Sequence, residues 1–105
     1  MKGELCMQSI HATELREKLE NGESLHIIDV REQDEYEAGH IPNVPLYPLS
    51  EFPQVTEKLA QDNVYHVICR SGGRSQTACD YLESQGYKVV NVDGGMLAWD
   101  GDIEA

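Results

Sequence analysis

The stretch Val64–Ser75, VYHVICRSGGRS, joins three different patterns within a few residues. Its first half is rich in β-branched and aromatic residues, which is typical of a strand, and this pattern stops at Cys69. A loop of Arg, Ser and Gly follows, and a helical pattern begins at Arg74. Two of the eight Lys and Arg residues of the chain, Arg70 and Arg74, lie in the five residues after the cysteine. The stretch therefore predicts a strand, a positively charged loop and a helix, with a cysteine at the junction.

Strand and helix patterns alternate on both sides of this stretch. We predict strands over 25–29, 64–69 and 88–92, a short strand at 44–46, helices over 12–21, 50–61 and 74–85, a helical turn within 31–39 and a last short helix within 94–99. Strands that alternate with helices indicate an α/β fold, a small parallel β-sheet sandwiched by helices. Residues 1–8 show no period, so we expect an N-terminal extension there and one domain over 9–105.

The composition narrows the class of protein. The 105 residues, 40% of them hydrophobic, suffice for one domain with a single modest core. No apolar run is long enough to span a bilayer, and the N-terminus lacks the apolar segment of a secretory signal, so we expect a cytoplasmic protein. A formal charge of −11 makes nucleic acid and anionic membranes poor partners.

The three cysteines, Cys6, Cys69 and Cys79, are few and odd in number, and they form no CxxC pair. The four histidines are scattered without the spacing of metal ligands. This pattern argues against a disulfide framework, and we expect neither a metal site nor a cofactor. We expect Cys79 to be a core residue, because it lies beside apolar residues on the predicted helix.

The loop after Cys69 has the features of an anion site. Ligands of parallel α/β sheets bind beyond the carboxyl ends of the strands, which is where Cys69 lies. Gly72 and Gly73 allow the backbone N–H groups to turn inward, the following helix adds its free N–H groups, and Arg70 and Arg74 add full charges. Such surroundings lower the pKa of a cysteine and favour its thiolate, which is the nucleophilic form. The loop thus predicts a reactive cysteine that faces an anionic substrate.

Two other interpretations of the loop are weaker. Cys69 could be an inert buried cysteine at a strand end, but that role gives no reason for the adjacent glycines and arginines. A phosphate-binding P-loop requires GxxxxGK followed by Ser or Thr, and SGGRS lacks both the glycine spacing and the lysine.

Three segments together resemble a single-domain rhodanese-like sulfurtransferase: IIDVREQDEYEAGHIPNV, CRSGGRS and GYKVVNVDGGMLAW. The resemblance extends over about residues 9–100, and Val44 departs from the small residue that usually follows GHIPN. It implies a small parallel sheet between helices. It also implies that Cys69 takes the outer sulfur of thiosulfate or a related persulfide donor, and that this sulfur passes to a thiol or to cyanide.

Loop length separates related activities within this superfamily. Related phosphatases and arsenate reductases have one more residue between the cysteine and the arginine, whereas four residues separate Cys69 from Arg74 here. This length favours sulfur transfer. A cysteine-dependent phosphatase or arsenate reductase is one alternative. A non-catalytic interaction module is another, although such a module would more often have lost the cysteine or the loop arginine.

The resemblance assigns roles to the surrounding residues. Cys69 is the expected catalytic residue, and the expected substrate-binding residues are Arg70, Ser71, Gly72, Gly73, Arg74 and Ser75. Arg74 could equally anchor the loop, and the two serines could cap the helix. Asp29 and Arg31 are expected to support the loop, because Asp29 ends a strand at the same sheet edge.

Three residues outside the loop are expected to be structural. His40 could act as a general base, but a thiolate that is already formed needs none, so we expect a structural histidine. We expect Met96 and Trp99 to complete the core; the alternative is that they line the entrance of the site. The expected partners are a small anionic sulfur donor and a thiol acceptor such as a thioredoxin-like protein, and the chain is expected to be a monomer.

Overall fold

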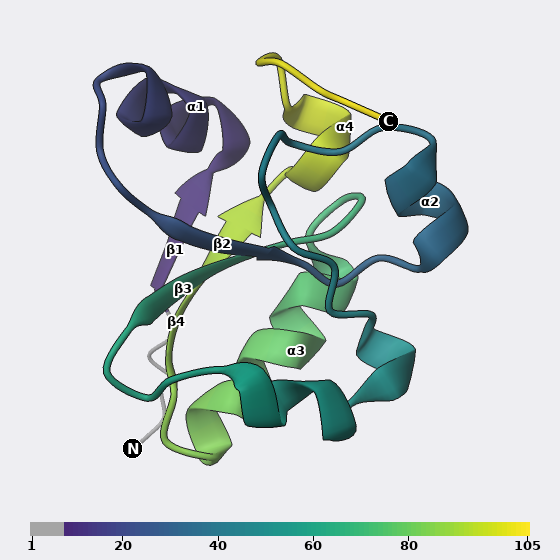
Figure 1. Ribbon diagram of the computed structural model, residues 1–105. Coiled ribbons are helices and arrows are strands. Elements are labelled where there is room, and N and C mark those ends of the chain that lie inside the picture. The colour runs from purple at the N-terminus through teal and green to yellow at the C-terminus, as the bar shows by residue number, and fades with distance from the viewer. Residues whose placement is uncertain (1–7) are drawn as a thin grey trace.

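The computed structural model describes residues 8–105, and four parallel strands within this range form its sheet (Figure 1). The strands lie in the order β1–β4–β3–β2. Their bounds are β1 Gln8–His11, β2 His26–Asp29, β3 Val64–Ile68 and β4 Lys88–Asp93. The two central strands, β3 and β4, are buried along most of their length, which explains their nearly continuous apolar sequences. This topology confirms the predicted α/β fold.

Helices cover both faces of the sheet (Figure 1). The α-helices are α1 Ala12–Glu20, α2 Gln33–Glu37, α3 Gly73–Ser84 and α4 Gly95–Ala98, and two 3₁₀ helices are η1 Leu49–Glu51 and η2 Gln54–Lys58. Figure 1 shows α1 and α4 above the sheet, with α3 and the 3₁₀ helices below it. Within residues 8–105, no helix is both long and apolar enough to cross a bilayer.

Each face of the sheet has its own core. On one face, α3 buries Ala78, Cys79 and Leu82 against strand residues that include Val67. On the other, α1 buries Ala12 at the centre of a second cluster. Met96 and Trp99 of the α4 region pack against this second cluster, in agreement with the prediction. Residues of β3 belong to both cores, and β3 is followed directly by Cys69.

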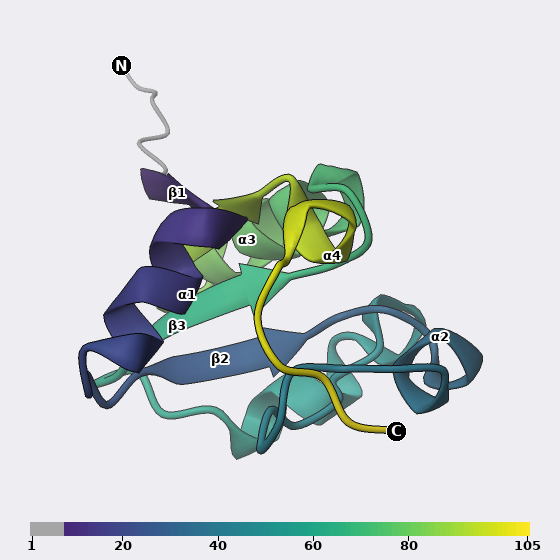
Figure 2. The same cartoon turned by 90° about the horizontal axis from the view of Figure 1, so that it is seen from above.

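The carboxyl ends of β2 and β3 lie side by side. Asp29, the last residue of β2, pairs with Ile68, the last residue of β3, so Asp29 lies at the same sheet edge as Cys69. The C-terminal segment passes toward the chain that follows α2 (Figure 2), where Glu104 and His40 exchange two backbone hydrogen bonds of 2.8 Å. Segments distant in sequence thus meet around the end of β3.

Three predictions about the elements need correction. The helix expected over 50–61 is wrong: Phe52 is extended because the following Pro53 disfavours the helical region, and two short 3₁₀ helices take its place. The strand expected at 44–46 is a single bridge between Leu46 and Asp29. The prediction missed β1, a short strand at the sheet edge in which only Ile10 is even half-buried.

The expected extension, residues 1–8, lies outside the described residues except for Gln8. Gln8 is the first residue of β1 and pairs with Val90 of β4. The strand β1 is therefore defined by its pairing with β4, and its own sequence has no hydrophobic pattern that would predict it.

Candidate active site

The backbone of the loop that follows β3 is held by the start of α4. Met96 N–H donates to the carbonyl of Cys69 at 2.8 Å, and Leu97 N–H donates to the carbonyl of Arg70 at 2.9 Å. Gly95 makes this approach possible, because a Cβ at this position would lie 2.4 Å from the Cys69 carbonyl oxygen. Gly95 also has a φ of +54°, which disfavours other residues. The GG pair after β4 is therefore part of the site's construction.

The Cys69 side chain lies inside the loop with no exposed surface. Its Sγ accepts hydrogen bonds from Gly72 N–H at 3.1 Å and from Ser75 N–H at 3.2 Å. Gly72, at φ +114°, bends the loop so that its N–H faces inward. Ser75 lies in the first turn of α3, where N–H groups have no helical acceptor and are free to bond the sulfur. Loop and helix together form a cradle of backbone donors around one sulfur atom.

The hydroxyl of Ser75 completes this cradle. Its Oγ lies 3.3 Å from Sγ and also donates to the Gly72 carbonyl at 3.1 Å. The protonated thiol donates to this hydroxyl, which donates its own hydrogen to Gly72. When Cys69 is ionised, the hydroxyl turns from the Gly72 carbonyl to donate to the sulfur, because it has one hydrogen to give. Ser71 does not take the capping role that the sequence left open for it. The N-cap residue of α3 is Gly72, and the helix start has no side-chain cap hydrogen bond.

The cradle changes the acidity of Cys69. Burial raises its pKa and is the largest single influence. Hydrogen bonds act in the opposite direction, first from the Ser75 hydroxyl and then from the backbone N–H groups of Ser75, Gly72 and Ser71. Together they outweigh burial, so the pKa of Cys69 is lowered from its ordinary value. The cradle therefore makes Cys69 easier to ionise than an ordinary cysteine, without a neighbouring base.

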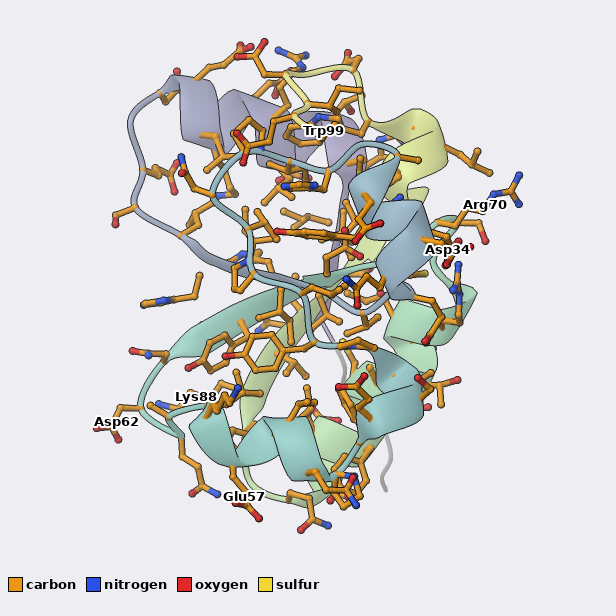
Figure 3. All side chains as sticks on the ribbon, turned by 45° about the vertical axis from the view of Figure 1, so that its right-hand side comes forward. Asp34, Glu57, Asp62, Arg70, Lys88 and Trp99 are labelled. Carbon is orange, nitrogen blue, oxygen red and sulfur yellow. The ribbon has the colours of Figure 1, made fainter. Side chains whose placement is uncertain are left out.

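The two loop arginines differ in what they contact. Arg74 forms a two-pronged ion pair with Glu35 of α2, with N–O distances of 2.7 and 2.8 Å. Arg70 is exposed, and within residues 8–105 it has no ion-pair partner. Figure 3 shows Arg70 projecting outward from the fold. Of the two expected anion-binding side chains, Arg74 is anchored by Glu35, and Arg70 has no such anchor among the described residues.

Asp29 and Arg31 form a buried ion pair beside the loop. Arg31 Nη2 donates to Asp29 Oδ2 at 2.8 Å and to the Gly39 carbonyl at 2.8 Å, and Arg31 Nε contacts both carboxylate oxygens. The backbone N–H of Arg31 also donates to Asp29 Oδ1 at 3.0 Å. This pair ties the end of β2 to the segment after α2. Neither side chain has a hydrogen bond to the Cys69 loop within the described residues.

His40 is buried, and its side-chain contacts among the described residues are with Tyr36 and Glu104. Its ring stacks on Tyr36 with centroids 3.6 Å apart, and Nδ1 lies 2.8 Å from the Tyr36 carbonyl. Its other nitrogen, Nε2, lies 3.4 Å from Glu104 Oε2. These contacts give His40 a structural place between α2 and the C-terminal segment.

Two residues of the site were not found by sequence reasoning. Glu35 stood in a segment predicted only as a polar helical turn, although the three-residue spacing from Glu32 is that of a capping box, which the structure shows. Gly95 was predicted only to begin a turn before a short helix. Its contact with the Cys69 carbonyl joins two distant segments and has no local pattern.

Among residues 8–105, no cluster of three or more His, Cys, Asp or Glu side chains could hold a metal ion.

The chain is similar to known proteins over nearly its whole length. A family model described as a rhodanese-like domain matches residues 11–102. The chain is 45% identical over 98 residues to YtwF of Bacillus subtilis, which covers 93% of this chain and 95% of that protein, and the name of YtwF places it provisionally among sulfurtransferases. It is 34% identical over 94 residues to a sulfurtransferase of Allochromatium vinosum, covering 89% of this chain and 88% of that one. The crystal structure of a rhodanese-like domain protein from Staphylococcus aureus matches with a TM-score of 0.87 and 38% identity, over 93% of this chain and 97% of that chain.

Proposed function

Because this chain belongs to the rhodanese-like family, we propose that it is a sulfurtransferase that carries a sulfane sulfur on Cys69. The donor is thiosulfate or a related persulfide, and the acceptor is a thiol or cyanide. The observation that carries the proposal is the cradle of N–H and O–H donors around the Cys69 sulfur, which lowers its pKa.

Sulfur loading follows from the thiolate. With thiosulfate as donor, the Cys69 thiolate attacks the outer sulfur and forms a new S–S bond. The bond between the outer sulfur and the sulfonyl group breaks, and its electron pair leaves with sulfite. The product is the Cys69 persulfide anion, so the total charge is conserved. Because backbone donors need no reorganisation during the step, they stabilise the sulfur anion before and after transfer.

Burial of the sulfur bears on the choice of donor. Sγ lies at the bottom of the loop with no exposed surface. This placement favours a donor that presents a single terminal sulfur over one that must bring a larger group to Sγ. Once loaded, the outer sulfur extends about 2 Å beyond Sγ. It is therefore the atom that an acceptor meets.

Sulfur release returns the site to its starting state. A thiolate or cyanide attacks the outer sulfur, its bond to Sγ breaks, and the electron pair returns to Cys69 as thiolate. The products are a new persulfide or thiocyanate. No proton transfer is required in this step, which agrees with the structural surroundings of His40.

The acceptor in the cell is a thiol, for which a thioredoxin-like protein or a small thiol is suitable. A free reactive cysteine suits a reducing compartment such as the cytoplasm. The charge of −11 argues against partners of nucleic acid or anionic membrane, and a domain of this size with two cores needs no second copy to fold.

A phosphatase or arsenate reductase is the weaker candidate. Four residues separate Cys69 from Arg74, one fewer than in those enzymes, and Glu35 already occupies the Arg74 guanidinium. A non-catalytic module is also weaker, because the cysteine and its complete set of donors are present.

The direct test is the intact mass of the protein after incubation with thiosulfate. We expect a gain of one sulfur atom that cyanide removes and that Cys69→Ala does not show. The matched control is Cys79→Ala, which should load normally. Phosphatase turnover without any sulfur adduct would overturn the proposal.

A further inference from the structure

Glu35 connects the first turns of two helices that belong to distant parts of the chain. Its Oε1 and Oε2 accept from the two terminal nitrogens of Arg74, at 2.7 and 2.8 Å. Oε1 also accepts from the backbone N–H of Glu32 at 3.0 Å, as part of the capping box of α2. The carboxylate is therefore held in place from α2 itself and presents a fixed pair of oxygens to Arg74.

This contact occupies the part of Arg74 that an anion would use. A guanidinium binds carboxylates and tetrahedral oxyanions through the same fork of N–H groups. Hydrogen bonding to Arg74 lowers the pKa of Glu35 to about 2, so the carboxylate remains charged at any ordinary pH. An incoming anion would have to displace Glu35 to reach Arg74, and it would meet the repulsion of that carboxylate.

Arg70 shows what an unoccupied arginine in this loop looks like. It is exposed, projects outward and has no ion-pair partner within residues 8–105 (Figure 3). The two arginines carry equal charge. Arg74 is held by Glu35, so of these two side chains Arg70 is the one that an anion can bind without displacing a carboxylate.

We propose that Glu35 determines which anions the Cys69 loop binds, by holding Arg74 in an ion pair so that Arg70 is the loop's one available cation. Oxyanions such as phosphate, which bind best where several full charges converge, are then bound weakly. Neutral N–H and O–H donors remain for the sulfur atom itself.

The consequence for the reaction rests on the proposed function. Sulfur loading releases sulfite, a doubly charged oxyanion, which must leave before an acceptor can approach. A second free arginine would retain sulfite and other oxyanions in the loop. In a phosphatase the oxyanion itself stays on the cysteine, so a free arginine is useful there. Glu35 therefore acts as a specificity-determining residue that suits this loop to sulfur transfer.

The test measures how well inorganic phosphate protects Cys69 from alkylation by iodoacetamide. The reaction is followed at Cys69 by peptide mass spectrometry, because two other cysteines are present, and ionic strength is held constant. Glu35→Gln should lower the phosphate concentration for half protection by about tenfold, the effect of about one partly screened charge. The matched control is Glu37→Gln, which removes the same charge from an exposed side chain of α2 that contacts Gln33 instead.

A double variant keeps the proposal testable even if Glu35→Gln disturbs the loop. Glu35→Gln combined with Arg74→Gln leaves the net charge unchanged. In this double variant, phosphate should half-protect Cys69 at the same concentration as in the natural protein. If the double variant needs far more phosphate than the natural protein, Arg74 already binds anions and the proposal is wrong. It is also wrong if Glu35→Gln and Glu37→Gln behave alike. No sulfur is transferred in this assay, so its outcome is separate from that of the sulfur-loading test.

Discussion

Cys69 and Cys79 are both fully buried, but their surroundings shift their pKa values in opposite directions. Burial raises the pKa of Cys79 to about 12, and nearby carboxylates act in the same direction. Burial also raises the pKa of Cys69, but donors from the loop and from Ser75 lower it more strongly. One thiol lies in the middle of α3, where the backbone N–H groups are already bonded, and the other faces a helix start, where they are free.

This difference shows that exposure is not what separates a reactive cysteine from an inert one in this fold. The Ser75 hydroxyl and a few inward-facing N–H groups decide the direction in which the pKa shifts. The following predictions test that comparison, from the largest expected effect to the smallest.

Sulfur loading should depend entirely on Cys69 and not on Cys79. We expect Cys69→Ala to abolish the mass gain after thiosulfate treatment, because it removes the only thiol with several hydrogen-bond donors among the described residues. Cys79→Ala should keep loading at a rate within a few-fold of the natural protein. Loss of sulfur loading in both variants would contradict the assignment of Cys69 as reactive and Cys79 as inert.

Cys79 should make the protein less stable in alkaline solution. The folded state raises the pKa of Cys79 from 9.0 to about 12, so between these values the unfolded state loses a proton that the folded state keeps. The free energy of unfolding therefore falls as the pH rises through this window, by about 4 kcal/mol at its upper end. In Cys79→Ala this contribution should be missing, and chemical denaturation between pH 8 and 11 (roughly the accessible range) should show a shallower decline. An identical slope for both proteins would mean that Cys79 ionises freely.

Gly95 should be needed to hold the backbone of Cys69. Gly95→Ala places a Cβ 2.4 Å from the Cys69 carbonyl oxygen and 2.7 Å from the Arg70 carbonyl, and backbone atoms cannot move aside cheaply. We expect a loss of about 3 kcal/mol in the free energy of unfolding, measured by urea denaturation. The stability control is Gly73→Ala, where no atom lies within 4 Å of the new Cβ. Equal stability of the two variants would show that the loop tolerates displacement.

The smallest effect should come from the Ser75 hydroxyl. Ser75→Ala keeps the backbone donor but removes the side-chain donor to Sγ, so the pKa of Cys69 should rise by about one unit or less. The alkylation rate of Cys69 against pH should shift upward accordingly. Thr77→Ala is the control, since its hydroxyl bonds the Gly73 carbonyl and not the sulfur. If the alkylation profile of Ser75→Ala does not move along the pH axis, the backbone donors alone lower the pKa of Cys69.

Much of the site could be predicted because it is contiguous in sequence. The strand, the glycines and the helix that follow one another around Cys69 are local features, and each has a recognisable pattern. The position of Asp29 could be predicted too, since parallel strands end at a common edge. The helix predicted over 50–61 is wrong because Pro53, which is compatible with a helix start, instead keeps Phe52 extended and separates two short 3₁₀ helices.

The sequence by itself determined the fold class, the strand–loop–helix unit and the identity of the cysteine at its centre. These depend on hydrophobic periodicity and glycine placement, which act over a few residues. Only the tertiary structure decided which charges and contacts that cysteine meets. Glu35 reaches Arg74 across 39 positions of the chain, and Gly95 meets the Cys69 carbonyl from the end of another strand. Electrostatic and steric effects act through space, so they follow the packing of distant segments and leave no local pattern in the sequence.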